Sequence, residues 1–291
     1  MTNHRLGGVI AAVPTPVDAK GQPDTQLFLR HAAWALANGC DGLNVLGTTG
    51  EANSLSAAQR RTIMATAAAG LDPLRLMVGT GTPDLETTIA LTRHAHELGF
   101  AGALILPPFY YKGVPEDGLF EWFARIVEAT ADAPIPVYLY NYPLMTGIRF
   151  SPELARRLAS ELSGRIVGAK DSSGEAGYAD QLAAIEGFDV FPSTEASLSL
   201  AARQGYAGCI SATVNVAPAL SAALWQDQAD AGLLARVSAI RAGVAAQPLI
   251  PAVKYLAGRI HGDAGFERVL PPMIELTGEQ KSALASLDLA A

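Results

Sequence analysis

Lys170 is the residue whose position most favours covalent chemistry. It ends the apolar run Ile166–Lys170, which has the length and composition of a buried strand. A neutral lysine amine attacks a carbonyl carbon to form an imine, and an apolar setting favours the neutral amine over the ammonium ion. A lysine at a strand end can also pair with a carboxylate, such as Asp171 or Glu195, or extend to solvent. Position alone leaves both interpretations open.

Tyrosines alternate along a second apolar run, Pro136–Pro143, and Tyr140 stands where this strand is expected to end. A phenol close to Lys170 could move the protons that imine formation and aldol cleavage require. Tyrosine is also common in strands for packing reasons alone, so this motif is ambiguous by itself. In the lysine strand, alternation places Ile166, Gly168 and Lys170 on one face, where Gly168 would leave space beneath the lysine.

Two loops after expected strands add hydroxyl groups. The glycines of Gly47–Glu51 permit the close backbone approach of an anion-binding turn, with Thr48 and Thr49 between them. Any tight strand-to-helix turn can look like this, and the loop lacks the lysine and spacing of a phosphate-binding P-loop. Pro107–Lys112 is unusually aromatic for a solvated loop. It is either part of a site, its own or a neighbouring subunit's, or an apolar subunit contact.

Histidine and cysteine do not form a metal-binding pattern. His94 and His96 are two positions apart on an expected helix and therefore diverge, unlike ligands at i and i+4. Cys40 and Cys209 lie far apart in apolar segments, which favours buried thiols in a reducing compartment over a zinc site or a redox pair. We therefore expect no metal site.

Composition indicates a soluble protein without nucleic-acid or membrane partners. The formal net charge is −7, and the Lys and Arg residues are scattered rather than gathered in a basic stripe. The hydrophobic fraction is 49%, yet no apolar run reaches the roughly 18 residues that a membrane-spanning helix needs. The first residues lack the apolar core and cleavage site of a signal peptide. These features predict a cytoplasmic location.

Strand-like runs alternate with helical segments about eight times along the chain. The expected strands are Val9–Val13, Gly42–Leu46, Leu76–Thr80, Gly102–Leu106, Pro136–Tyr140, Ile166–Lys170, Val190–Pro192 and Gly208–Ser211. Helix starts are expected at a capping box in Ser56–Gln59 and at the cap-then-proline pairs Thr82-Pro83 and Ser151-Pro152. Such alternation implies parallel strands.

Eight such units predict an α/β fold, a (β/α)₈ TIM barrel, with a doubly wound sheet as the alternative. The first expected strand is followed by Pro14-Thr15-Pro16 rather than by a dinucleotide-binding glycine motif, which favours the barrel. We expect one domain over residues 1–291, with the barrel at about 8–216 and a C-terminal helical extension at about 217–291. In such barrels the active site lies at the carboxyl ends of the strands, where the candidate residues above are found.

Taken together, these features resemble the dihydrodipicolinate synthase and N-acetylneuraminate lyase superfamily. The resemblance runs from about Gly8 to Leu276 and keeps the family's order and spacing of motifs, at Gly47–Glu51, Tyr140-Asn141, Gly168–Asp171 and Gly208–Ser211. It implies a class I aldolase that joins pyruvate or another 2-oxo acid to an aldehyde without a cofactor. It also implies a homotetramer built as a dimer of dimers.

The resemblance assigns roles to individual residues. It makes Lys170 the imine-forming lysine and Tyr140 the acid/base group. Thr48 relays protons between Tyr140 and Tyr111, and Tyr111 comes from a neighbouring subunit in several members. The resemblance also assigns substrate binding to three positions. Gly47 and Thr49 belong to the loop that holds the carboxylate of pyruvate, and the carbonyl of Ile210 faces the reacting centre.

Substrate choice depends on a departure from the family pattern. Dihydrodipicolinate synthases carry an arginine in the loop after the tyrosine strand, and this chain has Met145 at that position. Loss of a charge-assisted carboxylate clamp costs roughly 1.5–3 kcal/mol. The loop resembles that of 2-keto-3-deoxy-sugar-acid aldolases, and Ser193 and Glu195 stand where those enzymes contact substrate hydroxyls. A sugar-acid aldolase is favoured; dihydrodipicolinate synthesis, dehydration of a keto-deoxy acid and a non-catalytic binding protein remain alternatives.

Overall fold

The computed structural model describes residues 5–289, so residues 1–4 and 290–291 of the expected domain lie outside the described part. Eight parallel strands form one sheet in the order β7-β6-β5-β4-β3-β2-β1-β8. They are β1 (Gly8–Ala12), β2 (Gly42–Val45), β3 (Leu76–Gly79), β4 (Gly102–Ile105), β5 (Val137–Asn141), β6 (Ile166–Asp171), β7 (Asp189–Pro192) and β8 (Gly208–Ser211). All eight expected strands are confirmed, within about one residue at each end.

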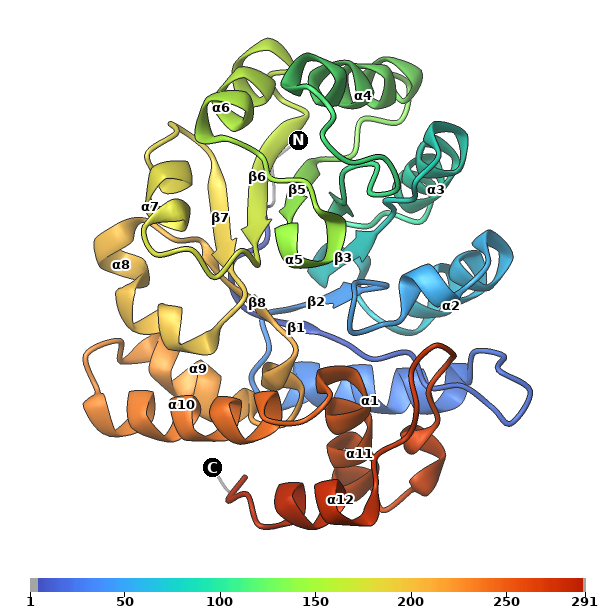
Figure 1. Ribbon diagram of the computed structural model, residues 1–291, viewed down its shortest axis with the longest axis vertical. Helices are drawn as coiled ribbons and strands as arrows, with labels where there is room; N and C mark the ends of the chain where they lie inside the picture. Colours follow the sequence, from blue (N-terminus) through green and yellow to red (C-terminus); the bar gives the residue numbers. More distant parts are fainter. Residues whose placement is uncertain (1–4, 290–291) are drawn as a thin grey trace.

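The sheet curls into a barrel with helices around it (Figure 1). Between β7 and β8, the amide of Ala207 donates to the carbonyl of Val190 at 3.0 Å, which brings the two ends of the sheet together. The helices are α1 (Thr25–Ala37), α2 (Ala57–Gly70), α3 (Leu85–Glu97), α4 (Glu116–Ala129), α5 (Pro143–Thr146), α6 (Pro152–Glu161), α7 (Tyr178–Ala183), α8 (Ala201–Gln204), α9 (Pro218–Gln226), α10 (Ala231–Ala245), α11 (Leu249–His261) and α12 (Gly278–Ala285). The (β/α)₈ barrel prediction is confirmed.

Two of the three predicted helix starts are correct. Ser56 and Gln59 form the expected capping box of α2, and Ser151 caps α6 with Pro152 in its first turn. The third is wrong: α3 begins after Asp84, whose carboxylate accepts the backbone N–H of Thr87 at 2.7 Å. A carboxylate at the N-cap satisfies a free amide and favours the positive end of the helix dipole, so Asp84 takes the capping position instead of Thr82.

Alternation along β6 is interrupted at its start. The pairing of β5 with β6 shifts between Val137 and Tyr138, so Val137 pairs with Ile166 but Tyr138 pairs with Gly168. Ile166 therefore packs in the outer core beneath the helices, while Val167 packs inside the barrel. The expectation that Ile166 shares a face with Lys170 is wrong, because a bulge resets the two-residue period.

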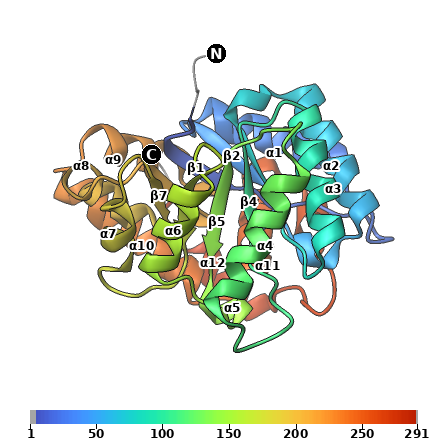
Figure 2. The ribbon, with the colours of Figure 1, turned by 90° about the horizontal axis from the view of Figure 1, so that it is seen from above.

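Helices continue beyond the eighth barrel unit. α9 packs against β1, in the place of the eighth barrel helix, and α10, α11 and α12 follow it (Figures 1 and 2). Within residues 5–289 no single helix is long and apolar enough to cross a bilayer. Among those residues, only α10 and α11 taken together have the length and apolar composition of a membrane span, and the two helices are bent by 114° relative to each other.

Candidate active site

Lys170 and Tyr140 lie side by side because β5 and β6 pair in register there. They are direct partners across the two strands, and the amine Nζ of Lys170 donates to the Tyr140 hydroxyl at 3.1 Å. The same nitrogen is 4.4 Å from the centre of the tyrosine ring. Both side chains are almost fully buried, at 4% and 3% exposed. The strand register thus puts an amine beside a hydroxyl that can exchange protons with it.

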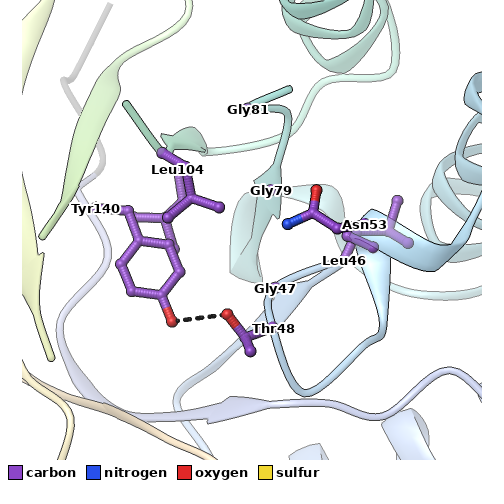
Figure 3. A pocket seen from close by; sticks show the side chains of 10 residues that line it. Leu46, Gly47, Thr48, Asn53, Gly79, Gly81, Leu104 and Tyr140 are labelled. Atoms are coloured by element: carbon purple, nitrogen blue, oxygen red, sulfur yellow. Dashed lines mark hydrogen bonds between the residues drawn. The ribbon is translucent and has the colours of Figure 1, made fainter. Parts of the chain in front are cut away.

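The Gly47–Glu51 loop brings a second hydroxyl to this pair. Thr48 Oγ1 is 3.1 Å from the Tyr140 hydroxyl, as Figure 3 shows, so lysine, phenol and threonine form a continuous hydrogen-bonded chain. Gly47 packs closely against Asn44, because a Cβ at position 47 would lie 2.4 Å from Nδ2 of that side chain, which would have to move. Gly47 does not adopt the left-handed backbone conformation. Two non-glycine residues do so: Leu46 (φ 55°), which precedes the loop, and Glu51 (φ 53°), which ends it.

A buried ion pair between Glu51 and Lys254 anchors the Gly47–Glu51 loop. Glu51 is fully buried and accepts the amide N–H of Leu270 at 2.7 Å, and it also pairs with Nζ of Lys254 from α11. Burial lowers the pKa of Lys254, and the negative charge of Glu51 acts against that shift. The pair links the Gly47–Glu51 loop to α11, because Lys254 is 203 residues after Glu51 in the sequence.

A cavity of about 310 Å³ opens above the amine of Lys170. Six of its lining residues were expected at the site from the sequence: Thr48, Thr49, Tyr140, Lys170, Ser193 and Ile210. The remaining lining residues were not singled out from the sequence: Tyr142, Leu144, Ser172, Ser173, Gly174, Ala212, Arg241, Leu249 and Ile250. Residues from five strand ends (β2, β5, β6, β7 and β8) and from α10 and α11 therefore converge on one space, as expected at the carboxyl end of a barrel.

Four predicted residues lie outside this lining. Gly47 borders a narrow hollow next to Tyr140 and Thr48 (Figure 3). Met145 is 60% exposed and lines two adjoining apolar hollows that also include Thr48. Tyr111 is 70% exposed, beside the equally exposed Tyr110. The fourth, Glu195, lies in the wall of the barrel behind the cavity.

Glu195 is nearly fully buried, and both of its carboxylate oxygens have partners. Oε1 accepts a short hydrogen bond from the hydroxyl of Thr213, and Oε2 is 3.0 Å from Nη1 of Arg241.

The gap that Gly168 was expected to leave beneath Lys170 is filled. A Cβ at Gly168 would lie 2.8 Å from the ring of Tyr138. The space beneath Lys170 is therefore filled by the Tyr138 ring, and the carboxylate of Glu195 is paired within the barrel wall.

Sequence reasoning missed Tyr142 and Arg241. Tyr142 stacks over Tyr140 with ring centres 5.8 Å apart. Burial raises its pKa, the nearby Tyr140 adds to this, and the positive charge of Arg241 acts in the opposite direction. Tyr142 belongs to the tyrosine motif and could have been noticed by its alternation. Arg241 stands in a helix 71 positions after Lys170 with no motif around it.

Cys40, Cys209 and His31 are buried in the packed interior. Burial raises the pKa of the Cys40 thiol to about 12 and that of Cys209 well above its usual value, so neither is a thiolate at neutral pH. His31 is buried against His261 and Asn215, and burial lowers its pKa to about 4. Among residues 5–289, no group of three His, Cys, Asp or Glu side chains is arranged to hold a metal ion.

Comparison with known proteins agrees with this geometry. Residues 5–289 match the model of the dihydrodipicolinate synthetase family. The chain is 34% identical to 4-hydroxy-tetrahydrodipicolinate synthase of Coxiella burnetii over 214 residues, which are 73% of this chain and 72% of that protein.

Two solved structures cover nearly the whole fold. Dihydrodipicolinate synthase from Agrobacterium tumefaciens superimposes with a TM-score of 0.89 at 29% identity, over 97% of this chain and 99% of that one. YagE from E. coli K12, solved in complex with pyruvate, gives 0.88 at 28% identity, over 97% of both chains. The chain therefore belongs to the dihydrodipicolinate synthetase family, whose members are class I lyases, and it is an enzyme of that class.

Proposed function

We propose that this enzyme forms an imine between Lys170 and pyruvate and catalyses reversible aldol cleavage and condensation of a 2-keto-3-deoxy sugar acid. The observation that carries the proposal is the buried lysine amine 3.1 Å from the Tyr140 hydroxyl, at the floor of a cavity. An amine held out of water and beside a proton donor suits attack on a ketone. The pyruvate bound by YagE, a relative of similar fold, supports the choice of 2-oxo acid.

In the cleavage direction, the Lys170 amine adds to the C2 ketone of the substrate and water leaves, which gives a protonated imine. Tyr140 takes the proton of the C4 hydroxyl, and Thr48 extends the proton path from its position 3.1 Å from the phenol. The C3–C4 bond breaks, its electron pair moves toward the imine nitrogen, and the aldehyde leaves. Protonation of the resulting enamine and addition of water release pyruvate and restore the amine.

The carboxylate of pyruvate needs donors that do not compete with the lysine. We assign this role to the amide and hydroxyl of Thr49, with Gly47 allowing the backbone to approach, since Thr49 lines the cavity and is nearly fully buried. The Ile210 carbonyl at the end of β8 is assigned to face the reacting carbon. Thr49 and Ile210 line the cavity that Lys170 lines, which supports the assignment.

Hydroxyl groups on the cavity wall support a sugar-derived substrate. Ser172, Ser173 and Ser193 line one side of the cavity, and hydroxyls can both donate to and accept from a polyol. Met145 supplies no clamp of the kind expected for a synthase that binds aspartate semialdehyde. Dehydration of a keto-deoxy acid would use the same imine and remains an alternative outcome.

A second candidate function is condensation of aspartate semialdehyde with pyruvate. It is favoured by the names of the curated relative and the Agrobacterium structure, and by the cationic Arg241 in the cavity wall. A coupled pyruvate-release assay over a panel of 2-keto-3-deoxy acids, run beside aspartate semialdehyde plus pyruvate, separates the two. We expect the highest kcat/KM for a keto-deoxy acid. A higher value for aspartate semialdehyde would replace the proposed function by the second candidate.

We further propose a homotetramer in which Tyr111 reaches the site of a neighbouring subunit. Tyr110, Leu144, Met145 and Ile274 add exposed apolar surface, which supports a subunit contact. Mixing inactive Lys170→Met subunits with inactive Tyr111→Phe subunits should restore part of the activity, because each mixed dimer then carries one complete site. No recovery on mixing, with a tetramer verified by sedimentation, would contradict a role in trans.

The buried thiols Cys40 and Cys209 are consistent with a cytoplasmic location.

A further inference from the structure

The side chain of Asn44 is a fully buried amide inside the barrel. Its neighbours in β2, Leu43 and Val45, pack in the outer core beneath the helices, so strand alternation points Asn44 toward the barrel axis. Neither Oδ1 nor Nδ2 of this side chain has a hydrogen-bond partner among residues 5–289. Buried amides in folded proteins are nearly always bonded to protein or to ordered water, because burial without a partner is unfavourable. Asn44 therefore indicates a small polar ligand.

Asn44 belongs to the same interior layer of the barrel as Lys170. Each such layer takes one side chain from every second strand. The last inward-facing residues of the even-numbered strands are Asn44 in β2, Leu104 in β4, Lys170 in β6 and Ile210 in β8. Lys170 and Ile210 line the cavity, and Leu104 lines the narrow hollow beside Tyr140 in Figure 3. The amide therefore lies in the layer that forms the floor of both spaces.

The narrow hollow has room for one water molecule. Its volume of about 10 Å³ is close to that of a single water-sized sphere. Gly47 lines the hollow, and Nδ2 of Asn44 lies against Gly47, 2.4 Å from the place where a Cβ would stand. Thr48 and Tyr140 also line it and bring two hydroxyl groups that are 3.1 Å apart. A buried water needs about two to four polar partners, and the amide and these hydroxyls can provide them.

We propose that Asn44 holds a water molecule beside Lys170, and that this water is the one exchanged when the imine forms and breaks. The inference rests on the proposed imine chemistry. In imine formation the C2–N bond forms and the C2–O bond breaks, and the oxygen leaves as water with two protons of the amine, which pass through Tyr140 and Thr48. On release, the water held by Asn44 adds to C2 and the steps reverse. Asn44 is a positioning residue, because it acts through the water.

Isotope exchange into pyruvate, in heavy water enriched in oxygen-18, tests this role. Imine formation and hydrolysis replace the C2 carbonyl oxygen, whereas enamine formation replaces methyl protons by deuterium, and mass spectrometry gives both initial rates from one sample. In Asn44→Leu, slower addition of water should prolong each imine. We expect the number of deuterons gained per oxygen exchanged to rise about tenfold, the value of one hydrogen bond. A purely structural disturbance of the site would slow both exchanges and leave their ratio unchanged.

Two further variants make the result interpretable. Asn44→Ala keeps room for water but removes the amide, so it should raise the ratio less than Asn44→Leu does, and it decides the question if the larger leucine prevents folding. Met77→Leu is the matched control and should keep the wild-type ratio, because Met77 pairs with Asn44 in register and packs inside the barrel without an amide. Uncatalysed exchange is subtracted, and borohydride trapping of pyruvate is measured in every variant.

A high-resolution crystal structure locates the water directly. We expect an ordered water bonded to the Asn44 amide and to the hydroxyl of Thr48 or Tyr140 in the wild type, and its loss in Asn44→Leu. Wild-type exchange ratios in both Asn44 variants, or an amide with no water bonded to it, would overturn the inference and leave the imine mechanism intact. A wild-type enzyme that exchanges neither oxygen nor methyl protons and traps no pyruvate would overturn the proposed function itself.

Discussion

Two buried lysines, Lys170 and Lys254, have opposite surroundings. Lys254 is fully enclosed and paired with the carboxylate of Glu51, which also accepts a backbone amide. Lys170 has the hydroxyl of Tyr140 as its partner, pairs with no carboxylate among residues 5–289, and borders a cavity. Under the proposed function, Lys254 is a structural link whose charge is paired, and Lys170 is the nucleophile. The partner and the adjacent space, rather than burial, are what distinguish the two lysines.

The largest expected contrast is between turnover and stability. Lys170→Met should abolish turnover, by more than ~10⁴-fold, because the nucleophile is gone. Its free energy of unfolding should stay the same or rise, since an apolar side chain replaces a buried amine without an ionic partner. Steady-state kinetics and denaturant unfolding check both parts. Retained turnover, with the substitution verified by mass spectrometry, would show that the imine forms elsewhere.

Lys254→Met should show the reverse pattern. It leaves Glu51 buried without its partner, which costs about 3–5 kcal/mol in the free energy of unfolding. The matched double variant, Lys254→Met with Glu51→Gln, should recover much of that loss because no charge remains unpaired. Denaturant titration measures both. If the single variant and the wild type have the same free energy of unfolding, the ion pair contributes nothing to stability. Lys254 would then not be a structural counterpart to Lys170.

Tyr140→Phe examines the hydroxyl partner of Lys170. The ring and its packing remain while the hydroxyl 3.1 Å from the amine is lost. We expect about 10²-fold or greater loss in kcat with pyruvate trapping largely retained. Unchanged kcat would assign Tyr140 to packing alone.

Met145→Arg should have the smallest effect. It adds a cation on the short helix α5, at an exposed position next to Leu144, which lines the Lys170 cavity, and solvent weakens ionic interactions there. The ratio of kcat/KM for aspartate semialdehyde to that for glyceraldehyde should rise by about tenfold at most. A decrease in that ratio would contradict a location of position 145 near the second substrate.

Local patterns were sufficient to predict the strands and most of the cavity floor. Lys170, Tyr140 and Thr48 each follow or end an apolar run, and the barrel places such positions at one end. The bulge between Val137 and Tyr138 could not be predicted, since it depends on how two strands meet rather than on either sequence alone.

Long-range partners were beyond sequence reasoning for a related reason. Glu51 pairs with Lys254, which is 203 residues later in the sequence, and Glu195 pairs with Arg241, which is 46 residues later. Both cationic residues stand in helices with no distinctive motif. Periodicity identifies such helices but not which of their charged side chains turns toward the barrel. The sequence-based substrate expectation stays a prediction, and it considered only the segment that contains Met145, because nothing in the sequence indicated that Arg241 lines the same cavity.

Borohydride reduction in the presence of pyruvate tests the central claim most directly. The reduced adduct is covalent, and peptide mass spectrometry locates it. We predict one pyruvyl group per chain, on Lys170, with Lys254 unmodified, and no adduct in Lys170→Met. A label on Lys254, or no label on wild-type protein that turns over substrate, would contradict the account.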